Sequence, residues 1–183
     1  MQISVLDLER EPLQFNLSLA PDAMDYGTEV TPVTPLAVEG RAELIEETHG
    51  PRTVIQDIRV RGDYLGEFEI ACARCLTPVR KKLAGSFDVL YRPLGADQGT
   101  PERSITASET EIGYYQESGL MLEDVLREQV LLSLPARTLC REDCKGLCPR
   151  CGKDLNTEQC TCETAPADPR WSALSDLAGR LKK

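Results

Sequence analysis

This chain of 183 residues lacks several features, and their absence narrows the range of functions it can have. It has a single histidine, His49 in a predicted turn, which is too few for a catalytic zinc site with several histidine ligands. No stretch approaches the roughly 18 consecutive apolar residues that a membrane-spanning helix needs. The N-terminal stretch has neither the basic start nor the long apolar run of a secretory signal. We therefore expect a cytoplasmic protein that has no membrane partner.

Positive charge is scarce as well. The sequence has 21 lysines and arginines against 30 aspartates and glutamates, a formal net charge of −9. A chain of this charge binds nucleic acid poorly unless a local patch is basic. Residues 72–92 hold such a group: Arg74, Arg80, Lys81, Lys82 and Arg92. The group is either a binding surface for an anionic partner or a solvated strand face that offsets the charge of nearby thiolates.

Signatures of nucleotide-binding and hydrolytic enzymes are missing too. The sequence contains no Walker loop, no dinucleotide-binding glycine motif and no GxSxG. A thiol oxidoreductase built on Cys72 and Cys75 is the rival interpretation of that pair. Such enzymes usually place the first cysteine at a helix N-terminus, whereas strands are predicted on both sides of this pair. We therefore expect no enzymatic activity and assign no catalytic residue.

Cysteine, in contrast, is abundant and regularly placed. The eight cysteines form four close pairs: Cys72/Cys75, Cys140/Cys144, Cys148/Cys151 and Cys160/Cys162. A tetrahedral zinc site takes four thiolates, usually from two such pairs, so four pairs make two sites with nothing left over. After the third pair, Gly152 is expected at positive φ, which turns backbone amides toward sulfur. A cytosolic chain with paired cysteines more often binds metal than forms disulfides.

The sequence leaves open which pairs share a metal ion. Joining the third pair to the fourth closes a short loop at low entropic cost and leaves the first pair for the second. The favoured ligand sets are then Cys72, Cys75, Cys140 and Cys144 for one zinc ion, and Cys148, Cys151, Cys160 and Cys162 for another. In the second pair, one helical turn would put both sulfurs on one face. The alternatives are a site made of the second and third pairs, a single zinc site, and free or disulfide-linked thiols.

Alternating apolar and polar residues predict an antiparallel sheet in the first half of the chain. The segments with this period are residues 13–19, 38–44, 58–61, 67–70 and 79–91. A loop over residues 20–35 follows the first segment, and the short connections between the other four favour a meander or a barrel-like sheet, with a hairpin turn at residues 62–66. The first cysteine pair lies at the last hairpin. Residues 93–112 are predicted to form an exposed, partly disordered loop.

Helical spacing follows in two places. Apolar residues such as Leu126 share one face of a helix predicted over residues 120–133, and Asp168 predicts the start of a terminal helix. The predicted class is therefore α+β, with a cysteine-rich zinc knuckle between the two helices. We expect a sheet domain with the packed helix over residues 1–135, and a zinc-binding segment with the terminal helix over residues 136–183.

Four strings of the sequence together resemble one known family. They are C-A-R-C-L after a predicted strand, the helix L-E-D-V-L-R-E-Q-V-L-L-S-L-P, the cysteine string C-K-G-L-C-P-R-C-G-K-D-L-N, and D-P-R-W-S-A-L. Running in this order over residues 60–183, they resemble the bacterial YceD family, whose members are named large ribosomal RNA subunit accumulation protein. The resemblance implies a cytoplasmic protein that supports accumulation of 23S ribosomal RNA and hence assembly of the large subunit.

The prediction that follows is a non-enzymatic factor that binds one or two zinc ions. Its implied partner is ribosomal RNA or a large-subunit assembly intermediate, reached directly or through a protein. The surface that binds RNA or this partner is expected at Arg74, Arg80, Lys81 and Lys82. The alternatives are a thiol redox or RNA-processing enzyme, and a regulatory protein that binds enzymes of fatty-acid synthesis.

Overall fold

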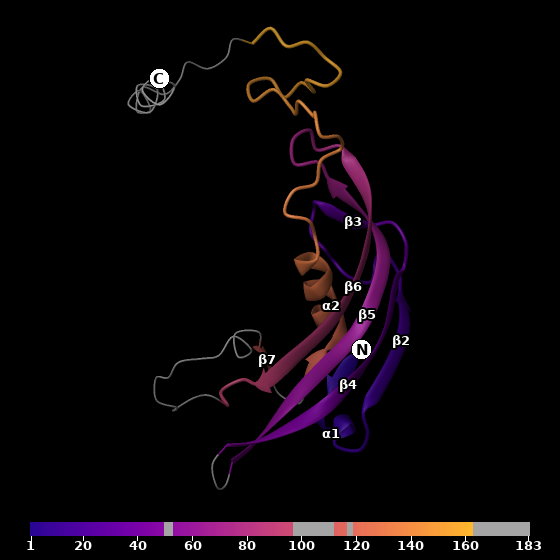
Figure 1. Ribbon diagram of the computed structural model, residues 1–183, viewed down its shortest axis with the longest axis vertical. Helices are drawn as coiled ribbons and strands as arrows, with labels where there is room; N and C mark the ends of the chain where they lie inside the picture. Colours follow the sequence, from indigo (N-terminus) through magenta and orange to yellow (C-terminus); the bar gives the residue numbers. More distant parts are fainter. Residues whose placement is uncertain (50–52, 97–111, 117–118, 163–183) are drawn as a thin grey trace, which may run out of the picture.

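The computed structural model describes residues 1–49, 53–96, 112–116 and 119–162 (Figure 1). Within these residues a six-stranded sheet forms the body of the molecule, and a two-stranded sheet and two helices accompany it. The strands of the large sheet are β2 (Leu13–Leu19), β3 (Val30–Pro32), β4 (Leu36–His49), β5 (Thr53–Ala71), β6 (Pro78–Pro93) and β7 (Ile112–Tyr115). The small sheet consists of β1 (Gln2–Ser4) and β8 (Gly119–Met121), and the helices are α1 (Val5–Leu8) and α2 (Leu122–Leu132).

The large sheet is open and mostly antiparallel. Its strand order is β2-β4-β5-β6-β7, and β3 pairs with the end of β5 that β4 leaves uncovered. β7 lies parallel to β6, and the other strand pairs of the sheet are antiparallel. Among the described residues β2 does not pair with β7, so the sheet is not closed into a barrel. The predicted α+β class, with an antiparallel sheet and a packed helix, is confirmed.

β5 runs without a break through residues 62–66, so the hairpin turn predicted there is wrong. The strand extends over 19 residues and pairs Gly62 with Gly40 of β4 and with Phe87 of β6. A Cβ atom at Gly62 would lie 3.2 Å from the Phe87 ring, and one at Gly40 would lie 2.6 Å from the Phe15 ring. The atom nearest to each added Cβ is a carbonyl oxygen of the adjacent strand, that of Arg61 at Gly40 and that of Glu39 at Gly62. Glycine is therefore needed at both positions because neighbouring backbone and aromatic rings lie close, and not because the chain turns.

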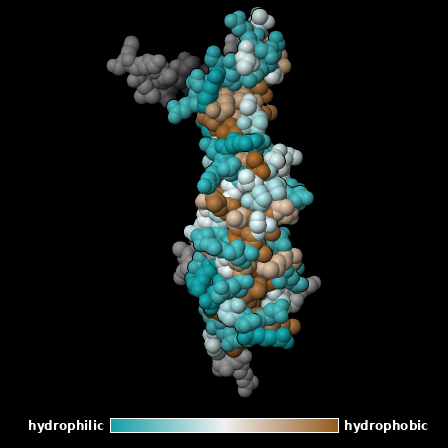
Figure 2. All heavy atoms as spheres, turned by 90° about the vertical axis from the view of Figure 1, so that its right-hand side faces the viewer, coloured by the Kyte–Doolittle hydropathy of each residue, from teal (hydrophilic) through white to brown (hydrophobic). Residues whose placement is uncertain are grey.

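The apolar core lies between the large sheet and α2. Val60 and Phe68 are both buried and lie on the same side of β5, as the two-residue period of a strand requires. Leu126 and Val130, one helical turn apart in α2, are 0% exposed. The helix predicted over residues 120–133 is therefore confirmed as α2, packed along one face of the sheet (Figure 1). The side of the molecule away from α2 is largely hydrophilic, with apolar atoms showing between polar ones (Figure 2).

A buried ion pair joins β5 to β6 at the end of the sheet that lies away from the cysteines. Arg92 is 4% exposed and donates from Nε to Asp57 Oδ1 at 3.1 Å and from Nη2 to Asp57 Oδ2 at 2.8 Å. Asp57 is 1% exposed, and Glu47 of β4 also accepts a hydrogen bond from Arg92 Nη2. Arg92 therefore belongs to the interior, although its place in the sequence puts it among the solvated basic residues.

Several predictions fall on residues outside the described part of the chain. They concern most of the turn predicted at residues 49–51, of which His49 ends β4, most of the loop over residues 93–112 and the terminal helix from Asp168. β6 extends to Pro93 and β7 begins at Ile112, so both ends of that predicted loop belong to strands. The division of the chain into two domains remains a prediction. None of the described helices has the length and apolar character needed to cross a membrane.

Candidate metal centre

The first tetrad forms where the hairpin between β5 and β6 meets the chain that follows α2. It consists of Cys72, Cys75, Cys140 and Cys144. Cys72 Sγ lies 3.9 Å from Cys144 Sγ, and Cys75 Sγ lies 3.6 Å from Cys140 Sγ. Cys144 lies at the end of a tight turn, in which its backbone amide donates to the Arg141 carbonyl at 3.2 Å. The helical turn predicted for Cys140 and Cys144 is not formed.

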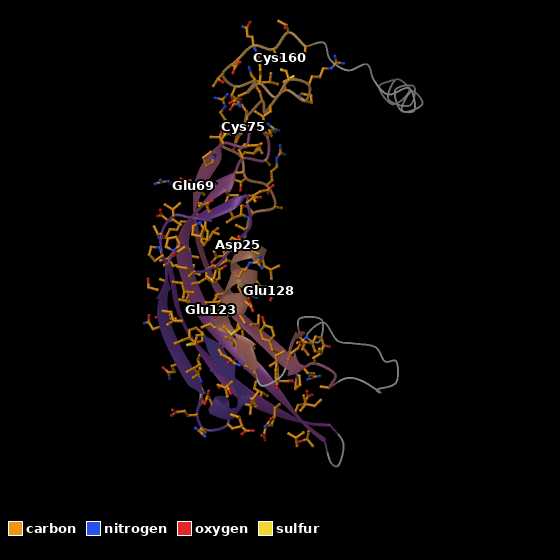
Figure 3. All side chains as sticks on the ribbon, turned by 180° about the vertical axis from the view of Figure 1, so that it is seen from behind. Asp25, Glu69, Cys75, Glu123, Glu128 and Cys160 are labelled. Carbon is orange, nitrogen blue, oxygen red and sulfur yellow. The ribbon has the colours of Figure 1, made fainter. Side chains whose placement is uncertain are left out.

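The second tetrad lies further out along the long axis of the molecule. It consists of Cys148, Cys151, Cys160 and Cys162. Cys160 Sγ lies 3.3 Å from Cys148 Sγ and 3.6 Å from Cys151 Sγ. Figure 3 shows Cys75 between the sheet and Cys160, so the two tetrads follow one another beyond the end of β5. The structure thus groups the cysteines in the favoured sets, and it does not bring the second and third pairs into one group.

The spacing of the sulfur atoms fits a tetrahedral metal ion. Four sulfurs at the usual Zn–S distance around one zinc ion lie about 3.8 Å apart. The sulfur separations quoted above, 3.3–3.9 Å, lie around this value, whereas a disulfide bond is about 2.0 Å long. All eight cysteines are free thiols. Each tetrad can therefore hold a metal ion with thiolate ligands.

Both CxxC turns end in the same backbone conformation. The amide of Gly152 donates to the Cys148 carbonyl at 2.9 Å, and the amide of Leu76 donates to the Cys72 carbonyl at 2.9 Å. Gly152 has a φ of 73°, which confirms the positive φ predicted for it. Leu76 has a φ of 62°, a left-handed conformation that costs a non-glycine residue about 1–2 kcal/mol. Since Leu76 is 63% exposed, we attribute its conformation to the geometry of the turn and not to packing.

Backbone amides make one thiol of each tetrad acidic. The amide of Arg74 makes the largest contribution to lowering the pKa of Cys72 to about 6. The amide of Cys151 makes the largest contribution to lowering the pKa of Cys148 to about 6. Hydrogen bonds donated to sulfur stabilise the charged thiolate more than the thiol. Each CxxC turn therefore offers a thiolate, the form that binds metal, at neutral pH.

Another thiol of each tetrad resists ionisation. Desolvation of its sulfur raises the pKa of Cys140 to about 12, and the neighbouring thiol of Cys160 raises the pKa of Cys162 to about 12. Thiolates gathered this closely repel one another when no cation lies between them, so the last thiol keeps its proton. A divalent cation would remove that repulsion. The electrostatics of both tetrads therefore favour a bound metal ion.

The two tetrads differ in their access to solvent. Cys72 is 0% and Cys144 is 1% exposed, and the first tetrad packs against apolar side chains of which Val79 and Leu147 are two. In the second tetrad only Cys148 is buried, and both Cys151 and Cys162 are exposed. Cys140 is the one exposed cysteine of the first tetrad, so a metal ion there would be better shielded from solvent than one in the second, which chelators and oxidants would reach more easily.

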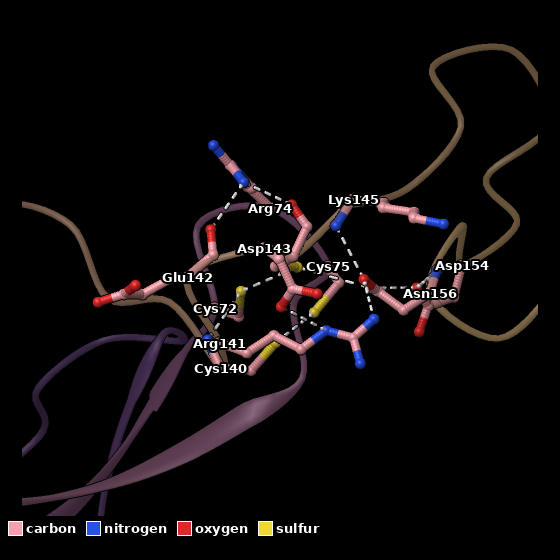
Figure 4. A network of polar contacts seen from close by, with 11 residues as sticks. Cys72, Arg74, Cys75, Cys140, Arg141, Glu142, Asp143, Lys145, Asp154 and Asn156 are labelled. Carbon is pink, nitrogen blue, oxygen red and sulfur yellow. Dashed lines mark hydrogen bonds and ion pairs between the residues drawn. The ribbon is translucent and has the colours of Figure 1, made fainter.

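The structure divides the predicted basic surface into two parts. Arg74 donates from Nη1 to the Cys144 carbonyl at 2.5 Å, across the first tetrad (Figure 4). Residues 80–82 lie in β6 and are exposed, and Arg80 forms an ion pair with Glu69 at 3.1 Å. Arg74 therefore holds the turn that delivers Cys144, while residues 80–82 remain on the surface.

Two polar residues that sequence reasoning did not single out lie beside the tetrads. Asn156 donates from Nδ2 to Cys144 Sγ at 3.5 Å. Asp154 Oδ1 accepts from the Asn156 backbone amide at 2.9 Å. An aspartate whose side chain accepts from the amide two residues on is typical of an Asx turn. The D-L-N string in the sequence could therefore have predicted this turn, although it does not indicate that Asn156 contacts a sulfur atom.

Relatives of this chain come from mycobacteria and from a plant. A protein of Mycobacterium tuberculosis (strain H37Rv), named only as uncharacterized, is 34% identical over 127 residues, which cover 69% of this chain and 58% of the relative. One of Mycobacterium leprae is 29% identical over 126 residues, which cover 68% and 55%. The chain thus spans little more than half the length of these relatives. A chloroplast protein of Arabidopsis thaliana, named large ribosomal RNA subunit accumulation protein YCED homolog 1, is 29% identical over 58 residues, or 32% of this chain and 18% of the relative. No solved structure matches.

One family profile matches residues 60–178. This range begins within β5, contains α2 and includes all eight cysteines. The family is described as large ribosomal RNA subunit accumulation protein YceD. The match covers well over half of the sequence and contains both tetrads, and on this evidence the chain belongs to the YceD family.

Proposed function

We propose that this protein is a non-enzymatic, zinc-binding factor that supports the accumulation of large-subunit ribosomal RNA. The observation that carries the proposal is the presence of two separate tetrads, each made of four cysteine sulfurs. Membership of a family described by large ribosomal RNA subunit accumulation supports the biological role. Zinc at the first tetrad would cross-link segments far apart in the chain, and zinc at the second would close a short loop. Each ion would offset half of the charge of four thiolates.

A structural role for zinc is supported by the number of ligands. Catalytic zinc keeps one coordination position open for water or substrate, whereas four thiolates fill the tetrahedron. Zinc at the first tetrad would join the β5–β6 hairpin to the chain after α2. Zinc at the second tetrad would close the loop between Cys151 and Cys160. The protein would then act by presenting a fixed surface to its partner.

The proposed contact with ribosomal RNA, or with an assembly particle that contains it, lies beside the first tetrad. Residues 80–82 follow the hairpin that holds Cys72 and Cys75, and all three basic side chains are exposed. Glu67 and Glu69 of β5 lie opposite them in the sheet, so acidic residues border the patch on one side. Binding of such a patch to phosphate releases counterions from the RNA. Because this release is less favourable at higher salt concentration, the affinity should fall as salt rises.

The metal part of the proposal can be tested by counting ions. Native mass spectrometry of the full chain should find two zinc ions, and Cys72→Ser and Cys148→Ser should each remove one. A folded chain that carries no zinc would refute this part.

The RNA part can be tested by reversing charge in cells that depend on the protein. Arg80→Glu combined with Lys82→Glu should retain two zinc ions and the wild-type melting temperature while lowering 23S ribosomal RNA. The matched control is Arg41→Glu combined with Arg61→Glu, which reverses two charges further along the same face of the sheet. Equal 23S RNA levels in the two variants would refute the contact surface.

A further inference from the structure

The loop of the second tetrad carries a residue that touches the first tetrad. This loop connects Cys151 to Cys160 and contains Asn156. Asn156 Nδ2 donates a hydrogen bond to Cys144 Sγ at 3.5 Å. Figure 4 shows Asn156 reaching toward the cysteines of the first tetrad. One side chain therefore belongs to the loop of one tetrad and bonds to a sulfur of the other.

Three further hydrogen bonds fix the orientation of the Asn156 side-chain amide, and a fourth holds its backbone. Its Oδ1 accepts from the Lys145 backbone amide at 2.8 Å and from Arg141 Nη2 at 2.9 Å. Asp154 Oδ1 accepts from Asn156 Nδ2 at 2.6 Å and from the Asn156 backbone amide at 2.9 Å. Because two donors occupy Oδ1, the amide nitrogen must face the other way, with one hydrogen for Asp154 and one for Cys144.

Backbone hydrogen bonds hold the two segments together around this contact. The amide of Leu147 donates to the Arg74 carbonyl at 3.0 Å, and the amide of Leu155 donates to the Gly146 carbonyl at 2.9 Å. Gly146 approaches the first CxxC turn so closely that a Cβ atom there would lie 2.9 Å from the Arg74 carbonyl oxygen. The first CxxC turn, the chain around Gly146 and the second loop therefore pack as one unit.

We propose that metal binding at the two tetrads is coupled through Asn156, which acts as a positioning residue for the first site. The inference rests on the proposed binding of zinc at both tetrads. A metal ion in the second tetrad holds its loop closed, and the closed loop presents Asn156 to Cys144. A hydrogen bond to a ligand sulfur stabilises the thiolate and fixes its direction, which strengthens metal binding. By linkage, metal in the first tetrad strengthens binding at the second by the same factor.

A double-mutant cycle measures the coupling. Cys162→Ser disables the second tetrad and leaves the first complete, and Asn156→Ala is introduced into both the wild type and this variant. The zinc affinity of the first site is then measured by competition with a chelator. In the wild-type background Asn156→Ala should lower that affinity roughly 10–100-fold, the usual effect of removing a hydrogen bond to a metal ligand. In the Cys162→Ser background the affinity should already be lower, and Asn156→Ala should change it much less.

With cobalt(II) in place of zinc, the absorption spectrum of the site can be measured, and a general loss of stability would not change the position of its bands. Asn156→Asp keeps an acceptor for Lys145 and Arg141 but has no hydrogen to donate to Cys144. The thiolate-to-cobalt absorption band of the first site should therefore shift in Asn156→Asp as it does in Asn156→Ala. Glu158→Gln is the matched control, because Glu158 lies in the same loop and pairs with Lys153 at 3.5 Å. It should leave the band and the affinity unchanged.

Two results would overturn the coupling. One is an equal effect of Asn156→Ala with and without the second tetrad. The other is a first site whose affinity and cobalt band do not respond to loss of the second tetrad. A wild-type chain that binds neither zinc nor cobalt would refute the proposed function and the coupling with it. That outcome differs from a chain that binds two metal ions independently, which would refute the coupling alone.

Discussion

Replacing Asp57 with alanine tests the buried ion pair that joins β5 to β6. The change removes both hydrogen bonds that the carboxylate accepts from Arg92, and it leaves the guanidinium at a position that is 4% exposed. Removing one partner of a buried pair usually costs about 3–5 kcal/mol, because the other charge stays buried. Glu47 still contacts Arg92 from a half-exposed position, so we expect the unfolding free energy to fall by about 2–4 kcal/mol.

A surface pair of the same chemistry on the same two strands provides the control. Arg59 of β5 donates to Asp88 of β6 from Nε at 2.7 Å and from Nη2 at 2.5 Å, but the Asp88 side chain is half exposed. Asp88→Ala should cost less than about 1 kcal/mol, because water solvates the charge that remains. Asp57→Leu combined with Arg92→Met removes both buried charges and should restore most of the stability lost in Asp57→Ala.

Urea denaturation of the metal-loaded protein, followed by far-ultraviolet circular dichroism, measures these free energies. An Asp57→Ala variant no less stable than Asp88→Ala would refute the reasoning, because burial would then make no difference to the pair. A double variant less stable than Asp57→Ala would also contradict it. That result would mean that the cost does not arise from the charge left behind.

Three further changes test the packing and the turns. Leu126→Asp places a charge at a 0% exposed position of α2 and should lower the unfolding free energy by at least about 3 kcal/mol; a wild-type melting curve would show that the helix is not docked. Gly40→Ala should cost about 1–3 kcal/mol in the same assay, because its Cβ would meet the Arg61 carbonyl oxygen and the Phe15 ring, and an unchanged curve would contradict the close approach. Leu76→Val should speed zinc loss to a chelator and Leu76→Gly should slow it, since a β-branched residue aggravates the left-handed turn; equal rates would contradict this account.

Long strands could be predicted from the sequence because their alternation is clear over many residues. Residues 13–19 coincide with β2, and residues 79–91 lie within β6. The sequence divides β5 wrongly because glycine usually ends a strand, whereas here it makes room for rings that other strands supply. β1, β3 and β8 have three residues each, too few to show a period. The parallel pairing of β7 depends on tertiary contacts that no local pattern records.

The sequence favours the observed cysteine sets among several, because each pair is local and joining the third pair to the fourth closes a short loop. The residues around the sulfurs could not be predicted. Leu76 gives no signal of a positive φ, since leucine rarely adopts one. Arg74 carries a charge that indicates a surface contact, and its carbonyl acceptor on Cys144 lies 70 positions away in the chain. Asn156 reaches Cys144 only after the two tetrads have packed together.

The two tetrads enclose very different lengths of chain, and this favours an order in which they close when the chain folds. Cys75 and Cys140 are 65 positions apart, whereas Cys151 and Cys160 are nine apart. Closing the longer loop costs about 2 kcal/mol more in chain entropy. If zinc binds as proposed, the second tetrad can capture its ion while the chain is still unfolded, whereas the first waits until folding brings Cys140 to the β5–β6 hairpin. The more exposed ion would then be the earlier one, and its closed loop would bring Asn156 to Cys144 as the two tetrads pack together.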